Sequence, residues 1–161
     1  MIRSAIATTI LVVALSTAAS ATGWRPGANT VDTAPPAASA AGKPACAPVA
    51  EYMRRVQTGE TAKMGDLFAE DGVFLVPNGQ VLKGRDAINA FFSRMAGHKT
   101  EAVAFNYVAE GSQCVMEMAG RHDPKNPTGP FTLSSDFVLV DGNGKIKQLI
   151  VYILPNPAPA K

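Results

Sequence analysis

A carboxylate in the middle of an apolar stretch is the first candidate for chemistry. Asp136 lies in the run over residues 131–140, whose alternation predicts a β-strand with Asp136 and Val138 on the same face. If the carboxyl group is desolvated there, its pKa should rise, and as a neutral acid it could donate a hydrogen bond. The alternative is an Asp136 that is exposed at an edge or bonded to a nearby Ser or Arg. We therefore treat Asp136 as a candidate pocket residue.

Tyr52 is a second polar group on an apolar surface. Val49, Tyr52, Met53 and Val56 follow the i, i+3, i+4, i+7 spacing of one helical face. The simplest interpretation is a core tyrosine whose hydroxyl reaches the rim. If Tyr52 and Asp136 instead point into one dry cavity, they would form a hydrogen-bonding site for a ligand carbonyl or hydroxyl group.

The remaining chemistry-bearing residues give weaker signals. His98 and His122 are the two histidines, and a structural or surface role is the expectation for both. No His or Cys pair has metal-ligand spacing, and the sequence contains no phosphate-binding loop, dinucleotide fingerprint or nucleophile elbow. We predict neither a metal nor a cofactor.

The amino terminus has the composition of a secretory signal. A positive start ends at Arg3, residues 5–15 are uncharged, and a small-residue cleavage site ends at Ala21. The uncharged run is shorter than the roughly 20 residues that span a bilayer. We expect residues 1–21 to be cleaved and the chain to be exported to the periplasm or the medium. An uncleaved anchor is the alternative, and no later segment is apolar enough to cross a membrane.

Composition divides the rest of the chain into three parts. Residues 22–45 are rich in Ala, Pro and Gly without a regular period, which predicts a disordered tether in which Trp24 is exposed. Residues 46–154 make one domain, and the proline-rich residues 155–161 form an irregular tail. The chain carries 15 Lys and Arg against 13 Asp and Glu, and this balance argues against a nucleic-acid partner.

The exported part contains both cysteines, Cys46 and Cys114. An even number of cysteines in an oxidising compartment suggests a disulfide, which would tie the start of the first helix to a central strand. The distance between the two residues cannot be read from the sequence. The pair is therefore a disulfide candidate, and a nucleophilic cysteine is the lesser alternative because neither has an obvious His partner.

Helical spacing dominates the first half of the domain and strand alternation the second. The expected helices cover residues 48–57, 61–69 and 84–95, and the expected strands cover 73–76, 80–83, 101–110, 113–121, 131–140 and 145–154. This order predicts an α+β fold with three N-terminal helices packed on a strongly curved, mostly antiparallel sheet. Such a cone encloses a pocket. Its candidate wall residues are Phe74, Val76, Phe92 and Leu149.

Two local motifs support this architecture. The segment LFAEDG over residues 67–72 and the segment KGRDAI over residues 83–88, together with Tyr52 and the turn at Gly59, resemble the SnoaL-like group of the nuclear transport factor 2-like superfamily. The resemblance covers residues 48–154 and implies the cone fold. Because the superfamily includes isomerases, dehydratases, cyclases, hydrolases and binding modules, it does not choose an activity.

The superfamily includes ketosteroid isomerase, whose site can be compared position by position. That family has a tyrosine seven positions before a turn glycine, as Tyr52 and Gly59 do, and a protonated aspartate eight positions before a hairpin glycine, as Asp136 and Gly144 do. The resemblance implies that Tyr52 and Asp136 are an oxyanion-binding pair. The family's carboxylate base precedes the proline that ends the first strand, and Val76 stands at that position here. Because valine cannot accept a proton, we do not infer the family's proton-transfer activity for this chain.

The opposite face of the strand over residues 131–140 has no expected helix to cover it. This face carries Phe131, Leu133, Phe137 and Leu139. Because an exposed apolar patch of this kind is usually an interface, we expect an isologous homodimer through the sheet.

Three functions follow from these observations. The preferred one is binding of a small, mostly apolar or carbonyl-bearing molecule in the cone. The first alternative is a lyase or isomerase that uses Tyr52 and Asp136 as an acid pair. The second is a module for dimerisation or interaction without catalysis.

Overall fold

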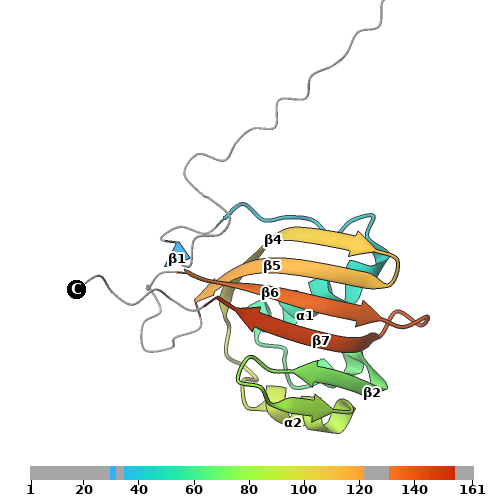
Figure 1. Cartoon of the computed structure of the whole chain (residues 1–161). Coiled ribbons are helices and arrows are strands. Elements are labelled where there is room, and N and C mark those ends of the chain that lie inside the picture. Colours follow the sequence, from blue (N-terminus) through green and yellow to red (C-terminus); the bar gives the residue numbers. More distant parts are fainter. Residues whose placement is uncertain (1–29, 32–34, 122–130, 155–161) are drawn as a thin grey trace, which may run out of the picture.

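The computed structural model describes residues 30–31, 35–121 and 131–154 (Figure 1). The expected signal at 1–21, the tail at 155–161 and His122 lie outside the described residues. No helix within the described ranges is both long and apolar enough to cross a membrane.

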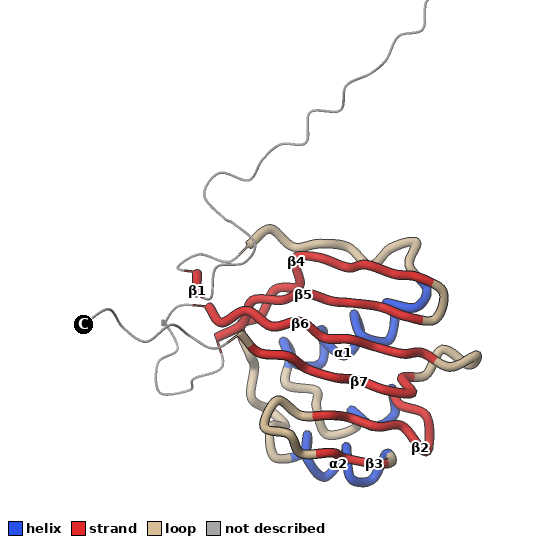
Figure 2. The backbone as a smooth tube through the Cα atoms, in the orientation of Figure 1, coloured by secondary structure: helices blue, strands red, loops and turns tan. Residues whose placement is uncertain are grey.

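A curved sheet organises the described part of the chain (Figures 1 and 2). Its strand order is β3-β2-β7-β6-β5-β4, and β1 pairs with β6 beside this path. All neighbours are antiparallel except β2 and β7, which are parallel. The strands are β1 (Thr30–Val31), β2 (Phe68–Leu75), β3 (Val81–Lys83), β4 (Glu101–Glu110), β5 (Gln113–Arg121), β6 (Phe131–Val140) and β7 (Ile146–Ile153).

Two α-helices lie against one face of the sheet (Figure 2). Helix α1 (Ala47–Thr58) buries Val49, Tyr52 and Met53 and ends at Gly59, whose φ of 77° is left-handed. A Cβ atom at Gly59 would also approach the backbone of Gly97 to 2.9 Å. Both the left-handed φ and this close contact therefore favour glycine at position 59. Helix α2 (Arg85–Ser93) buries Ile88 and Phe92.

The α+β class is as predicted, but the expected helix over residues 61–69 is wrong. The described residues there form only a short 3-10 helix, η2 (Met64–Leu67), and the chain becomes extended at Phe68. Phe68 is fully buried and pairs with Ile146 of β7. Parallel pairing with a distant strand thus overrides the local helical spacing, as tertiary contacts often do.

The expected disordered tether also needs correction. A second 3-10 helix, η1 (Pro44–Cys46), precedes α1, and Pro35 and Ala45 are buried. The backbone N–H of Ala38 donates to the carbonyl of Ala104 over 2.8 Å, which uses the otherwise free edge of β4. Part of the expected tether is therefore attached to the sheet, because β1 pairs with β6 and the residues from Pro35 onward reach the edge of β4.

The two cysteines are joined in the structure. Cys46 and Cys114 form a disulfide with a Cα–Cα distance of 5.2 Å, and it links the start of α1 to β5. The bridge spans a sequence separation of 68 residues. In the chain-entropy treatment a loop of this length contributes about 4 kcal/mol to stability.

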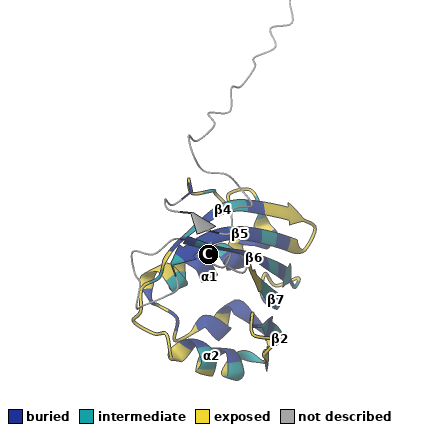
Figure 3. Ribbon diagram, turned by 60° about the vertical axis from the view of Figure 1, so that its left-hand side comes forward, coloured by how far each residue is buried: buried dark blue, intermediate teal, exposed yellow. Residues whose placement is uncertain are grey.

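The sheet has a core on each face. The larger core lies between the sheet and the two helices (Figure 3). A smaller one on the opposite face groups Ala119, Phe131 and Leu133, with Phe105 packed against them. Two of the four residues expected to form an open patch are therefore buried on their own chain. Below, the inner face is the face toward the helices, and the outer face is the opposite one.

Candidate functional site

Asp136 lies at the centre of the inner face. The register of the sheet places it between Met116 of β5 and Val151 of β7. Asp136 is only 1% exposed, and its strand neighbour on the same face, Val138, is fully buried. Strand alternation therefore placed this carboxyl group on the correct face, and the sheet carries it into the domain interior.

The carboxyl group of Asp136 has no hydrogen-bond partner among the described residues. Neither oxygen is accessible to solvent. Burial raises the pKa of Asp136 from 3.8 to about 7, because the charged form loses its hydration. The group can thus be neutral or charged near neutral pH, and in either form its hydrogen-bonding capacity is unused.

Tyr52 approaches from α1, as the resemblance implied. It is 9% exposed, and its ring meets Phe92 edge to face with a centroid distance of 5.8 Å. Burial, and then the negative charge of Asp136, raise the pKa of Tyr52 well above its ordinary value. The phenol therefore stays protonated and remains a hydrogen-bond donor throughout the neutral range.

A second phenol, Tyr107, was missed by the sequence analysis. Tyr107 of β4 pairs with Met116, which in turn pairs with Asp136, so the three residues form one row across the inner face. Burial and the charge of Asp136 also raise the pKa of Tyr107.

A bulge in β4 explains the omission of Tyr107. Ala102 and Ala104 face the inner core, and simple alternation from them would put Tyr107 on the outer face. The pairing of β4 with β5 shifts between Ala104 and Asn106, so β4 has one residue more than β5 at this point. This bulge turns Tyr107 toward the inner face. Only the strand register reveals that a second phenol lies on the same face as Asp136.

The expected wall residues gather in the same interior. Phe74, Val76, Phe92 and Leu149 are all buried, between 0% and 8% exposed. Phe74 and Phe92 stack with a centroid distance of 5.5 Å, and Phe91 meets both edge to face. The six candidate residues thus lie in one inner core. Asp136 itself is 1% exposed, so in this conformation it does not face the open funnel that the sequence predicted.

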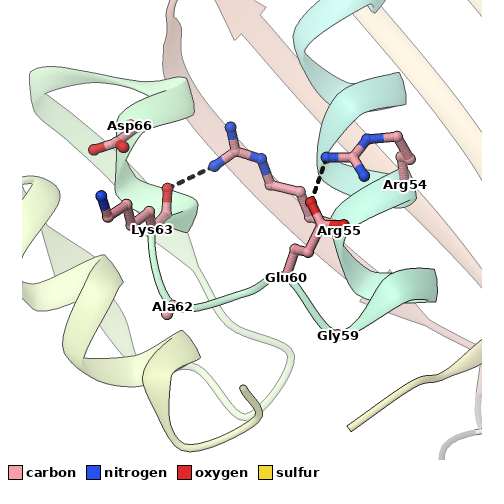
Figure 4. Close-up of a pocket in the computed structure, with 7 residues that line it drawn as sticks. All are labelled: Arg54, Arg55, Gly59, Glu60, Ala62, Lys63 and Asp66. Atoms are coloured by element: carbon pink, nitrogen blue, oxygen red, sulfur yellow. Dashed lines mark hydrogen bonds and ion pairs between the residues drawn. The ribbon is translucent and has the colours of Figure 1, made fainter. Parts of the chain in front are cut away.

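The surface pocket at the end of α1 is of a different kind (Figure 4). It has a volume of about 380 Å³, and Arg54 in its wall is ion-paired: it contacts Glu51 and Glu60 at 2.7 and 2.8 Å. Arg55 donates to the carbonyl of Lys63 at 2.7 Å. Arg54 also lowers the pKa of Glu51 to about 2. Satisfied and exposed charges of this kind typify a solvated surface, so we place the site at Asp136.

The remaining candidates lie away from Asp136. His98 is exposed after the end of α2. Across the described ranges, no group of three or more His, Cys, Asp or Glu could hold a metal ion.

Comparison with known proteins agrees with this architecture. Residues 49–149 match the SnoaL-like domain family, which is well over half of the chain. The chain belongs to the SnoaL-like domain family. The match includes Tyr52, Phe74, Val76, Phe92, Tyr107, Asp136 and Leu149. The curated proteins include no significant match to this SnoaL-like chain.

Solved structures share the SnoaL-like fold. SalBIII, an epoxide hydrolase/cyclase-like enzyme in salinomycin pyran-ring formation, is 22% identical, with 68% of this chain and 89% of that chain covered and a TM-score of 0.56. A Kribbella flavida protein whose name relates it to ketosteroid isomerases is 13% identical, covering 73% and 83%, with a TM-score of 0.59. A ketosteroid isomerase-like protein from Catenulispora acidiphila in complex with trimethylamine is 19% identical, covering 66% and 84%, with a TM-score of 0.54. At these identities the likeness establishes the fold alone.

Proposed function

We propose that this SnoaL-like domain binds a small, mostly apolar molecule whose one hydrogen-bonding group meets Asp136. The observation that carries the proposal is the pair of buried carboxyl oxygens that have no partner within the described part of the chain. A buried polar group left unpaired costs about 1–3 kcal/mol, and an apolar side chain at the same place would avoid that penalty. Such a group in a native structure therefore calls for an explanation, and a ligand that completes its hydrogen bonds provides one.

The surrounding residues define what the ligand must offer. Phe74, Phe92 and Leu149 present only apolar surface, whereas Asp136 with Tyr52 and Tyr107 gathers three hydroxyl-bearing groups when the acid is neutral. Below its pKa of about 7, Asp136 can donate to a carbonyl or ether oxygen. Above it, the carboxylate accepts from a hydroxyl or an ammonium group. A relative with this fold holds trimethylamine, which supports the small size of the ligand.

Entry requires movement of side chains, because the interior is closed around Asp136. The edge-to-face contact of Tyr52 with Phe92 joins the two helices across the interior. Rotation of one of these rings is the opening that we propose, because it would break no strand pair. The observed affinity is then the affinity of the open form multiplied by the fraction of molecules that are open.

Native mass spectrometry of the protein purified from its source tests the proposal, because it detects a carried compound directly. Titration with cyclohexanone and trimethylamine, followed by NMR of the tyrosine rings, is the defined assay. We expect Asp136→Leu to fold and to weaken binding at least about tenfold, the loss of one good hydrogen bond. Ser134→Ala, on the same strand and face, is the matched control and should bind as the parent does. A protein that carries no compound and binds neither probe contradicts the proposal.

One observation favours an enzymatic alternative. A pKa near 7 suits Asp136 to proton transfer at neutral pH. We propose, as a second candidate, a lyase or isomerase in which Asp136 itself moves the proton and Tyr52 donates to the substrate oxygen, since Val76 cannot be the base. NMR in D₂O would detect exchange of the protons next to the carbonyl of cyclohexanone. Exchange that survives in Asp136→Asn would exclude this role.

We also propose that the chain works outside the cytoplasm. The Cys46–Cys114 disulfide supports this location, because such bonds persist in oxidising compartments. Intact-mass measurement of the protein from its source should give a chain that begins at Thr22. An unprocessed amino terminus with two free thiols would contradict export.

A further inference from the structure

The outer face of the sheet carries a pocket that is separate from the Asp136 site. Its volume is about 240 Å³, below the roughly 300–1,000 Å³ usual for drug-sized ligands. It lies where the end of β7 meets β6, and residues of both faces contribute to it at this end of the sheet; it is lined by Phe105, Glu117, Leu133, Ser134, Ser135, Tyr152, Ile153 and Leu154. Tyr152, Ile153 and Leu154 are 59%, 45% and 42% exposed, an unusual concentration of uncovered apolar surface.

The pairing of β1 brings Thr30 next to this pocket, because Thr30 lies opposite Thr132 and the adjacent Leu133 lines the pocket. Thr30 lies opposite Thr132 and Val31 opposite Phe131, in antiparallel sense. The residues before Thr30 would next lie opposite Leu133 and Ser134 of β6. Those places are occupied, because Leu154 donates its N–H to the carbonyl of Leu133 and Ile153 pairs with Ser134. Further pairing along this side of β6 is therefore blocked at the position of the pocket.

The sequence before Thr30 suits the pocket in size, reach and charge. Trp24, the chain's one tryptophan, precedes Thr30 by six positions, a span of at most about 20 Å. Pro26-Gly27 lies between them and favours a turn. Arg25 adjoins Trp24, and among the described residues that line the pocket the charged one is Glu117. Ser135 and Glu117 can accept the indole N–H.

We propose that Trp24 fills the outer pocket of its own chain, with Arg25 next to Glu117. The indole ring would pack on the apolar side chains of Leu133, Tyr152 and Leu154. The amino-terminal segment would then be anchored to the domain at two places, the β1 pairing and the pocket. The pocket would not be open to a second copy of the chain, so this proposal competes with a homodimer through the same surface.

Fluorescence of the single tryptophan tests the proposal without any label. In the folded full-length chain, we expect emission at shorter wavelength than in the unfolded chain and several-fold weaker quenching by acrylamide. Tyr152→Ala removes a wall of the pocket and should shift the emission toward that of the unfolded chain. Val108→Ala, an exposed residue of β4 outside the pocket, is the control and should leave the spectrum unchanged.

Two outcomes would overturn the proposal. Emission and quenching that equal those of the unfolded chain, while circular dichroism shows a folded domain, would mean that Trp24 is exposed. Shielding that disappears on dilution, together with a dimer in sedimentation, would mean that a second copy covers the pocket. Shielding that does not depend on concentration and is lost in Tyr152→Ala supports the intramolecular contact.

Discussion

Two acidic residues on neighbouring strands of this sheet have opposite environments. Asp136 points to the inner face, where it is buried without a hydrogen bond and its pKa is raised to about 7. Glu117 points to the outer face, is partly exposed, and accepts a 2.8 Å hydrogen bond from Asn106. The two residues are one position apart in the register, since Met116 pairs with Asp136 and Glu117 with Ser135. The same sheet thus satisfies one acid and leaves the other unsatisfied, which marks Asp136 as the functional candidate.

The pH dependence of stability should show the effect of burying Asp136 most clearly. The pKa of Asp136 in the folded protein lies above its ordinary value of 3.8, so folding favours the neutral form. The free energy of unfolding is therefore highest, as far as Asp136 is concerned, below about pH 4. It falls by up to about 4 kcal/mol as the pH rises to about 7. In urea unfolding experiments, the free energy of unfolding of Asp136→Asn should not fall over this pH range. That of Glu117→Gln should fall as the parent's does. A parent protein equally stable at pH 4.5 and pH 8 would contradict the assignment.

Removing the unsatisfied acid should stabilise the domain. At pH 8, Asp136→Leu exchanges a buried, unpaired charge for apolar contacts, and we expect a gain of about 1–4 kcal/mol in the free energy of unfolding. Thermal unfolding measures this gain. Ser134→Leu, which places the same side chain on the same buried face, controls for a general effect of added bulk. Destabilisation by Asp136→Leu alone would indicate a structural role for the carboxyl group.

The two phenols near Asp136 should matter for binding more than for stability. Tyr52→Phe and Tyr107→Phe remove hydroxyl groups from the inner face, and we expect stability changes within about 1 kcal/mol. Binding of a carbonyl probe should weaken in both variants. Tyr152→Phe, an exposed phenol on the outer face, should change neither quantity. Equal affinity in all three variants would leave Asp136 as the sole polar contact.

The smallest effect is expected for the satisfied acid. Glu117→Gln keeps a hydrogen-bond acceptor for Asn106 and lies at the partly exposed face. Its free energy of unfolding should stay within about 0.5 kcal/mol of the parent value in calorimetry. A larger loss would show that the carboxylate of Glu117 interacts with a charged group, which would itself support a nearby Arg25.

Local pattern predicted much of the fold because the strands alternate cleanly. The expected strands over 101–110, 113–121 and 131–140 coincide with β4, β5 and β6. Where the local pattern failed, a distant partner was responsible: Phe68 pairs with β7 instead of extending a helix, and residues from Pro35 onward use the edge of β4. Such partners are invisible in a window of a few residues.

The amino-acid sequence by itself determined the α+β class, the face of Asp136 and the helical position of Tyr52, because side-chain periodicity follows directly from backbone geometry. Only the tertiary structure decided that Tyr107 joins them, because a bulge reverses its face, and that both oxygens of Asp136 lack a partner, because hydrogen-bond satisfaction depends on every element packed around the group. It also decided that the interior closes around the site. Closure depends on how side chains from α1, α2, β2 and β7 fill the same space, which no single segment encodes.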